Sequence, residues 1–509
     1  MSAQPPNAHQ YGPGINRISV TGFKSLATKI DLEIRPLTVL AGANSSGKSS
    51  FMQPLLLLKQ TLESDVNPAG PFLLSGPYTR YTQARQLLSR PYLAGDRRRR
   101  PLTFEFSFDE GMTAGMLYSA GTETGLSIEE SWGSKSTEES QWRITTRSTP
   151  DELRAMLLKF SSIPLMMDQV GLTALSAVNS RFYQGVLYST PAGDGPRGVA
   201  MERRELYYMQ ESLALNSHIR RMIYVPGLRG DQNRRWLFTD VSEHGFFEGP
   251  FESYVPSLIY SWHHADDTNR EDELESGLEH LGLASGIVSI KVSESEVEVL
   301  IPIALESSLP KVTGPRRRKM EELSFEFSKG EAEEVDSFLN RAMKRFGAKD
   351  HAEALLRVAL EHTHVNIADV GLAVSTVLPV LVALIQADPG QLVYIEQPEL
   401  HLHPRAQWRL AHLLGHAANR GVRLVIETHS SLLLRGILTQ IAESKIANDK
   451  IILHWFERDK VSGVSSVHSK EPDPAGRVGD WPDDFGDVEL ESTNEYLDAA
   501  ESKLFSGDK

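Results

Sequence analysis

The chain contains no cysteine among its 509 residues. This absence excludes disulfide bonds, thiolate zinc sites and cysteine nucleophiles. No run of uncharged apolar residues reaches the roughly 18 that a membrane-spanning helix needs, so we expect no contact with a membrane. Residues 1–14 are polar, contain proline and glycine, and lack the apolar segment of a secretion signal. We therefore expect a flexible N-terminal tail and a cytoplasmic protein.

Positive charge is also scarce, since 53 Lys and Arg face 67 Asp and Glu for a formal net charge of −14. Such a balance is not typical of a nucleic-acid-binding protein. Three local basic clusters are exceptions, and each is either a solvated loop or a contact for DNA phosphates. Trp236 beside one of them could stack on a base. The clusters are Arg97–Arg100, Arg234–Arg235 and Arg316–Lys319.

A phosphate-binding loop is the most informative feature that is present, and it spans Gly42–Ser49. It follows an apolar, branched run typical of a buried strand and precedes an apolar helix. Backbone N–H groups and the helix N-terminus then face a polyphosphate. We expect Lys48 to reach the β- and γ-phosphates of ATP, and the Ser49 hydroxyl to bind Mg²⁺. The residues expected to contact ATP are Gly42, Asn44, Ser45, Ser46, Gly47, Lys48, Ser49 and Ser50.

An acidic residue ends a second apolar run, where Leu392–Ile395 leads into Glu396, Gln397 and Glu399. A carboxylate at the C-terminal end of a buried strand can hold Mg²⁺ directly or through water. We expect Glu396 to be this metal ligand together with Ser49. The alternative is a strand-terminal acid that makes an ordinary surface contact.

A histidine ends a third apolar run, since Val422–Ile426 continues into Glu427, Thr428 and His429. A histidine at a strand end can hydrogen-bond a γ-phosphate oxygen or the attacking water. Alone it would be an ordinary, partly buried histidine. Next to the two preceding motifs, it favours a nucleotide site.

These motifs and their order resemble the ABC-type ATPase heads of the RecF, SMC and OLD group. Within that group, they resemble AAA-family ATPases with a DUF3696-like C-terminal region. Matching segments are Ile18–Ser25 as a first strand with a basic turn, Val365–Pro379 as a signature, and Gly479–Phe485 as a Trp-Pro element. The resemblance implies an α/β P-loop NTPase head with a mixed sheet flanked by helices, a β-rich N-terminal subdomain and a mainly helical insertion.

The resemblance also implies a domain order. It comprises a tail (1–14), an N-terminal lobe with the phosphate loop (15–130), an insertion serving as lid or arm (131–347), a C-terminal lobe (348–470) and a DUF3696-like element (471–509).

Two such heads dimerise head to tail around ATP in the group that this chain resembles. The resemblance therefore implies a homodimer or higher even oligomer in which Ser375 and the helix after it act in trans on the nucleotide held by the opposite Lys48. It also suggests Lys24 and, after the phosphate-loop helix, Gln83 as further nucleotide contacts; an ordinary loop amide is the alternative for Gln83.

One position departs from that pattern, because most relatives carry a general-base glutamate where this chain has Gln397. An amide cannot take a proton from water, although it can orient one. Either Glu399, His429 or Glu427 supplies the base, or hydrolysis is slow and the ATP-bound dimer persists. We assign the catalytic set to Glu396, Gln397, Glu399 and His429, and expect low turnover.

Three functions remain after these assignments. The resemblance favours a regulatory ATPase of anti-phage defence that gates an effector, expected to be a nuclease. The effector is expected to be a separate protein, because no acidic nuclease cluster follows Ser430 in this chain. The alternative is a RecF-like DNA-binding ATPase in DNA repair. A transporter ATPase fits least, because such subunits are shorter and keep the general-base glutamate.

The middle of the chain carries weaker patterns. Strict alternation predicts a strand over Leu102–Phe108, and Val297–Ile303 also favours a strand. No apolar heptad persists, which excludes a long coiled-coil arm. Arg229 could contact nucleotide, nucleic acid or a core carboxylate. Helices are expected over Glu152–Ser180, Glu202–Met222 and Glu331–Phe346.

Overall fold

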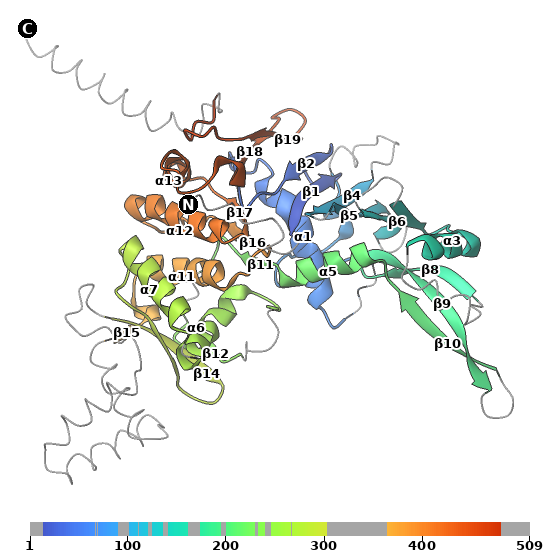
Figure 1. Cartoon of the computed structure of the whole chain (residues 1–509), viewed down its shortest axis with the longest axis horizontal. Helices are drawn as coiled ribbons and strands as arrows, with labels where there is room; N and C mark the ends of the chain where they lie inside the picture. The colour runs from blue at the N-terminus through green and yellow to red at the C-terminus, as the bar shows by residue number, and fades with distance from the viewer. Residues whose placement is uncertain are drawn as a thin grey trace, which may run out of the picture. The chain divides into compact units, whose positions relative to one another are not determined.

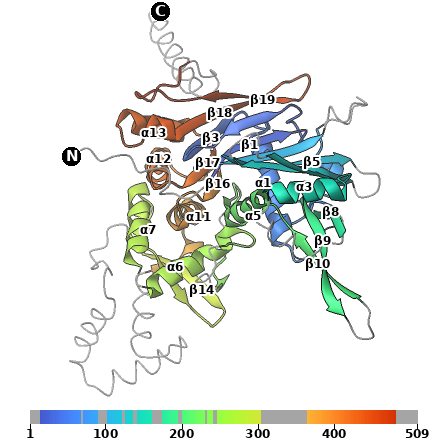
Figure 2. The same ribbon diagram turned by 45° about the vertical axis from the view of Figure 1, so that its right-hand side comes forward.

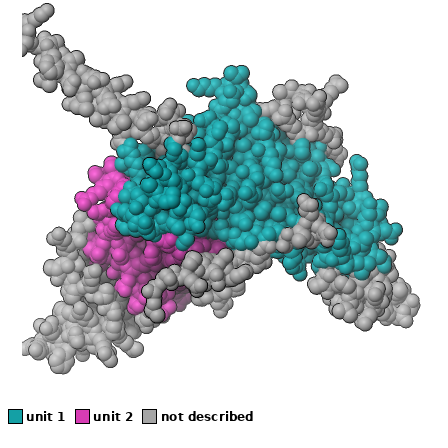
Figure 3. Space-filling view, turned by 45° about the horizontal axis from the view of Figure 1, so that its top comes forward, with its two compact units in different colours: residues 1–217, 423–509 teal, residues 218–422 magenta. Residues whose placement is uncertain are grey.

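The computed structural model divides the chain into two compact units, each coloured separately in Figure 3. Unit 1 contains residues 1–217 and 423–509, and unit 2 contains residues 218–422. Within this division, the structure describes residues 14–66, 68, 70–89, 101–109, 111–120, 125–135, 141–160, 174–194, 200–229, 233–239, 246–265, 267–302 and 364–479. Every helix in those ranges is too short or too polar to cross a membrane.

The first sheet of unit 1 is antiparallel and has six strands. It contains the predicted strand at Leu102–Phe108, whose residues alternate between buried and half-buried. The β-rich N-terminal subdomain is therefore confirmed (Figure 1). In spatial order its strands are β2 (Ile30–Glu33), β1 (Ile15–Thr21), β4 (Leu102–Phe108), β5 (Met112–Ala120), β6 (Leu126–Lys135) and β7 (Gln141–Thr145).

A second group of strands in unit 1 positions the phosphate loop. Strand β3 (Leu37–Gly42) is buried along its whole length and lies between two parallel neighbours, β17 (Arg423–Glu427) and β18 (Ile451–Arg458). Strand β19 (Ser465–Lys470) pairs antiparallel with β18. Because parallel strands end at the same edge, the loop after β3 and the residues after β17 share that edge. Helices α1 (Lys48–Glu63) and α13 (Ser431–Ala442) follow β3 and β17.

A three-stranded antiparallel sheet lies elsewhere in unit 1, and its long strands β9 and β10 run side by side in Figures 1 and 2. The helices predicted over Glu152–Ser180 and Glu202–Met222 are each wrong in part, because β8 and β10 of this sheet occupy part of these ranges. Strands β8 and β10 both pair with β9, and these pairings override the local helical pattern. The elements are α3 (Pro150–Phe160), β8 (Ala174–Ser180), β9 (Tyr183–Asp194), β10 (Ala200–Tyr207) and α5 (Gln210–Arg221).

Unit 2 combines a parallel strand pair with helices and a small antiparallel sheet. The pair is β11 (Ile223–Val225) and β16 (Leu392–Glu396). The sheet has the order β12 (Trp236–Leu237), β14 (Glu296–Pro302) and β13 (Val288–Lys291), and β15 (His364–Asn366) also pairs with β14. The helices are α6 (Val255–His264), α7 (Thr268–Leu281), α11 (Leu372–Gln386) and α12 (Pro404–Asn419).

These elements confirm the strand predicted over Val297–Ile303, within one residue at each end. The segment 131–347 contains strands as well as helices in its described residues, so the expectation of a mainly helical insertion is wrong there. The expected helix over Glu331–Phe346, the Trp-Pro element beyond residue 479 and the tail over residues 1–13 lie outside the described residues. The division into units falls after residues 217 and 422.

A buried histidine on β18 gives unit 1 a predictable response to acid. The His454 side chain is fully buried, its Nδ1 is 2.8 Å from Ser469 Oγ, and its Nε2 is 2.9 Å from the carbonyl oxygen of Glu33. Burial lowers the pKa of His454 to about 4, although the Glu33 carbonyl opposes this shift. The neutral imidazole is therefore the form that the fold accommodates.

We expect His454 to cost the protein about 3 kcal/mol of unfolding free energy as the pH falls from about 6.5 to 4, at roughly 1.4 kcal/mol per pKa unit. The unfolded histidine binds a proton in this window and the folded one does not, so stability decreases with acidification. Urea unfolding at several pH values should give a flatter curve for His454→Gln than for the natural protein. Parallel curves would contradict this expectation.

Candidate nucleotide site

Two glycines shape the phosphate loop between β3 and α1. Gly42 has φ 137° and Gly47 has φ 113°, a region that side chains rarely adopt. A Cβ atom at Gly42 would lie 2.2 Å from the carbonyl oxygen of Phe456, and one at Gly47 would lie 2.6 Å from Ser465 Oγ. Both positions therefore require glycine, and the neighbouring β18 and β19 hold the loop closely.

The interior of the loop is rich in donors. Lys48 Nζ donates to the carbonyl oxygens of Gly42 at 2.9 Å and Ala43 at 2.8 Å. Burial lowers the pKa of Lys48, and the charge of Glu427 partly opposes this shift. The buried Ser46 hydroxyl has no partner among the described residues, and no side chain caps the N-terminus of α1. Such an arrangement fits a polyphosphate, which would accept from these donors.

Ser49 already contacts an acid from the neighbouring strand. Its Oγ donates to Glu427 Oε1 at 2.9 Å, and Glu427 is only 5% exposed at the end of β17. The sequence indicates Glu427 only as one of three possible bases. Its adjacency to Ser49 follows from the parallel pairing of β17 with β3, which the two apolar runs alone do not specify.

His429 follows on the same strand end. Its pKa is lowered, first by burial and then by the positive charge of Lys48. The imidazole is therefore neutral at neutral pH and keeps one N–H and one acceptor nitrogen. This state suits a hydrogen bond to a phosphate oxygen or a water molecule. The structure thus brings His429 to the same edge of unit 1 as the loop.

The remaining predicted contacts in unit 1 are placed as follows. Lys24 has φ 49°, and its Nζ donates to Gln53 Oε1 at 2.5 Å and lies 4.7 Å from the Tyr81 ring centroid. Gln83 is exposed at the start of a short 3₁₀ helix (Ala84–Gln86). Asn44 and Ser45 are exposed at the loop tip and Ser50 is half-buried in α1. Contacts between these residues and nucleotide stay predictions.

In unit 2, the acidic turn after β16 is held by its own neighbours. Glu396 Oε1 accepts from the Tyr394 hydroxyl at 3.0 Å, and Glu396 Oε2 accepts from the Gly227 N–H at 3.2 Å. Gln397 has φ 45°, and Glu399 is 8% exposed. A shared magnesium site of Ser49 and Glu396 joins residues of two units and stays a prediction.

Arg229 has a structural role in unit 2, but its hydrogen-bond partners are backbone carbonyl oxygens and not the core carboxylate that the sequence offered as the structural option. Its guanidinium donates to the carbonyl oxygens of Thr376 at 2.6 Å, Glu396 at 2.7 Å, and Pro226 and Gln397 at 2.9 Å each. Burial lowers its pKa to about 10 despite nearby carboxylates. Arg229 therefore fixes the end of β16, where Glu396 lies, to the first turns of α11.

Ser375 lies within α11, because the helix begins at Leu372. The expectation that the helix starts after Ser375 is therefore wrong by a turn. Ser375 Oγ donates to the carbonyl oxygen of Leu372 at 3.1 Å, and the residue is 9% exposed. It lines a cavity of about 220 Å³ together with Trp236 and Glu252. The action of Ser375 in trans stays a prediction.

The basic cluster Arg234–Arg235 is ion-paired within unit 2. Arg234 Nη1 lies 3.0 Å from Asp369 Oδ2, and Arg235 Nε lies 2.9 Å from Glu298 Oε1. The clusters Arg97–Arg100 and Arg316–Lys319 lie outside the described residues. In the described part of the chain, the basic cluster therefore has acidic partners of its own.

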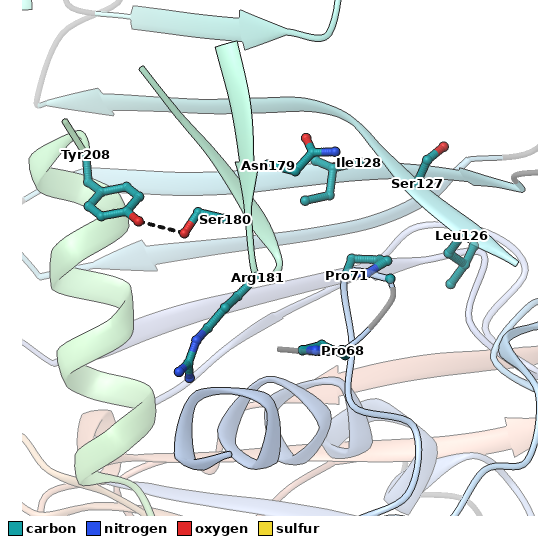
Figure 4. A pocket seen from close by; sticks show the side chains of 10 residues that line it. Pro68, Pro71, Leu126, Ser127, Ile128, Asn179, Ser180, Arg181 and Tyr208 are labelled. Atoms are coloured by element: carbon teal, nitrogen blue, oxygen red, sulfur yellow. Dashed lines mark hydrogen bonds between the residues drawn. The ribbon is translucent and has the colours of Figure 1, made fainter. Parts of the chain in front are cut away.

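A second cavity, of about 590 Å³, lies in unit 1 at the C-terminal end of α1 (Figure 4). Arg181 points from the β8–β9 turn toward this end, where it donates to the carbonyl oxygens of Thr61 at 2.8 Å and Ser64 at 3.2 Å. Ser180 and Tyr208 hydroxyls lie 2.6 Å apart. Because the phosphate loop is at the opposite end of α1, this cavity is separate from the nucleotide site.

The buried strand, the glycine-shaped loop and the lysine inside it define the chain as a P-loop nucleotide-binding protein. A family model described as "AAA domain, putative AbiEii toxin, Type IV TA system" matches residues 37–157 and 242–435. The match covers more than half of the chain, which therefore belongs to this family. A search of curated proteins found no match.

Three solved structures are similar to this chain at low sequence identity. An Smc head bound to the C-terminal winged-helix domain of ScpA is 12% identical, with a TM-score of 0.37 over 90% of this chain and 98% of that one. An Smc head with an extended coiled coil, bound to the C-terminal domain of ScpA derived from Pyrococcus furiosus, is 13% identical, with a TM-score of 0.34 over 96% and 100%. The SMC head domain from Thermotoga maritima is 8% identical, with a TM-score of 0.30 over 89% and 98%.

Proposed function

We propose that the protein is a regulatory ATPase that dimerises by sandwiching ATP and gates a separate effector, a nuclease, in anti-phage defence. The observation that carries the ATPase part is that Lys48 Nζ lies inside the phosphate loop, where it donates to the carbonyl oxygens of Gly42 and Ala43. The family description, which names a toxin, favours a defence role over transport. The ion pairs of Arg234 and Arg235 weaken the alternative of a DNA-binding ATPase.

In this proposal, the phosphate loop of unit 1 binds the polyphosphate. Lys48 moves its contacts from two carbonyl oxygens to the β- and γ-phosphates, and the buried Ser46 hydroxyl gains an acceptor. Ser49 and Glu396 would hold Mg²⁺, which supplies charge neutralisation for the leaving phosphates when bound. His429, neutral at physiological pH, hydrogen-bonds the γ-phosphate or orients the attacking water.

Slow turnover follows from Gln397, because its amide can orient water but not accept its proton. We assign proton acceptance to Glu399, which is buried in the same turn. Glu399→Gln is expected to lower the rate of phosphate release by on the order of 10² or more, with ATP affinity nearly unchanged. Glu294→Gln is the control, because Glu294 is exposed in unit 2, and it should leave the rate of phosphate release unchanged. A fast wild-type rate that Glu399→Gln leaves unaltered would exclude this account.

Gating predicts a physical and an enzymatic link to the effector. If a neighbouring reading frame encodes a nuclease, its product co-expressed with this chain should co-purify with it. Nuclease activity in that complex should differ between the natural protein with ATP and Lys48→Ala with ATP. If the two proteins do not co-purify, and if nuclease activity is equal with the natural protein and with Lys48→Ala, gating is ruled out.

A further inference from the structure

A buried carboxylate from β17 lies directly beside the proposed metal ligand of the phosphate loop. Glu427 Oε1 is 2.9 Å from Ser49 Oγ, and both residues belong to unit 1. Glu427 is only 5% exposed. A carboxylate is costly to bury unless it is paired or coordinates a metal. Glu427 has the Ser49 hydroxyl and the positive charge of Lys48 beside it, so its carboxylate belongs to the polar interior of the phosphate loop.

The spacing of the two oxygens suits a magnesium ion. Octahedral Mg²⁺ binds oxygen at about 2.0–2.1 Å, which puts adjacent ligands roughly 2.9 Å apart. Ser49 Oγ and Glu427 Oε1 are already at that separation. An ion could therefore lie between the two oxygens, with the Ser49 hydroxyl still protonated and its O–H turned away, without a change in strand register. The parallel pairing of β17 with β3 fixes this register, with Glu427 opposite Leu40.

Glu396, the acid expected at the metal, is engaged differently. Both of its carboxylate oxygens accept hydrogen bonds inside unit 2, from Tyr394 and from the backbone of Gly227. Glu427 is the acid for which the structure shows contact with the loop itself. Its negative charge also acts on the Lys48 ammonium, so two loop residues respond to it.

We propose that Glu427 is a second acidic residue of the magnesium site, which it forms with Ser49 on unit 1. This inference rests on the proposed function, because it assumes that the loop binds ATP. It also narrows the search for the general base. A carboxylate committed to the metal does not accept the proton of the attacking water, which agrees with the assignment of that step to Glu399.

The sign of the effect on ATP affinity gives a sharp test. Without a divalent ion, Glu427 repels the polyphosphate, so Glu427→Gln should bind ATP more tightly than the natural protein in EDTA. With Mg²⁺, the same variant should bind ATP more weakly, because a ligand of the ion is missing. A merely structural role for Glu427 would weaken binding in both conditions.

The experiment uses the full chain with a fluorescent ATP analogue, titrated in EDTA and in Mg²⁺. Electron paramagnetic resonance of Mn²⁺ bound to the ATP complex reports metal affinity directly. Glu427→Gln and Ser49→Ala should each weaken Mn²⁺ affinity on the order of 10 to 100-fold. Asp449→Asn, an exposed acid in the turn before β18, is the matched control and should change neither titration.

Each outcome decides a different claim. A Glu427→Gln variant that binds Mn²⁺ and ATP like the natural protein overturns the inference and leaves the proposed function intact. A natural protein that binds no ATP overturns both. If Glu427→Gln does not fold, Glu427→Asp keeps the charge and shortens the side chain. Glu427→Asp should bind Mn²⁺ more weakly than the natural protein, but it should not bind ATP more tightly in EDTA. Unchanged Mn²⁺ affinity in Glu427→Asp would also overturn the inference.

Discussion

Lys48→Ala is expected to weaken ATP binding by at least about 100-fold, because each charge-assisted hydrogen bond to phosphate contributes roughly 1.5–3 kcal/mol and Lys48 is expected to make two. Its ammonium lies inside the loop, 2.9 Å from the Gly42 carbonyl oxygen and 2.8 Å from that of Ala43. Isothermal titration calorimetry with ATP and Mg²⁺ measures the change. No other described side chain of the loop carries a positive charge.

Lys460→Ala is the control for charge, since Lys460 is exposed in the turn between β18 and β19. It should bind ATP like the natural protein. Thermal unfolding without nucleotide checks that Lys48→Ala folds. A folded Lys48→Ala protein with undiminished ATP affinity would show that the loop is not the nucleotide site.

Arg229→Met is expected to destabilise the protein by about 3–5 kcal/mol, because it removes several hydrogen bonds from a charged donor, each of which contributes roughly 1.5–3 kcal/mol. Four backbone carbonyl oxygens would lose their donor, including those of Glu396 and Gln397. Arg229→Lys should recover only part of this loss, because an ammonium cannot reproduce the planar fork of the guanidinium. Urea unfolding gives the unfolding free energies of the natural protein, Arg229→Met and Arg229→Lys.

Arg405→Met is the matched control, because Arg405 is exposed at the start of α12 in the same unit. Its unfolding free energy should stay within about 0.5 kcal/mol of the natural value. If Arg229→Met were as stable as Arg405→Met, the guanidinium would not be what holds the end of β16.

Local patterns were enough to predict the phosphate loop and its frame. The apolar run before Gly42 forms β3, and the apolar run after Lys48 forms α1. Glycine at 42 and 47 could be understood in advance, because only glycine tolerates such a tight path. Strand ends also located Glu396 and His429, since functional residues of parallel sheets cluster at carboxyl ends.

Long-range pairing could not be predicted in the same way. The local pattern predicts helix for residues 174–180 and 202–207, yet these residues pair with β9. The contact of Glu427 with Ser49 joins residues 378 positions apart. The role of Arg229 depends on carbonyl groups from α11 and β16. Such contacts depend on which strands and helices become neighbours, and one sequence does not encode this locally.

The most direct test of the ATP-sandwich account is light scattering of the purified protein with and without ATP and Mg²⁺, run alongside phosphate release. We predict that ATP drives or tightens a dimer that hydrolyses ATP slowly, that Lys48→Ala stays in the nucleotide-free state, and that Glu399→Gln prolongs the dimer. Rapid hydrolysis by a monomer whose mass ATP does not change would contradict the sandwich mechanism and the role of Ser375 in it.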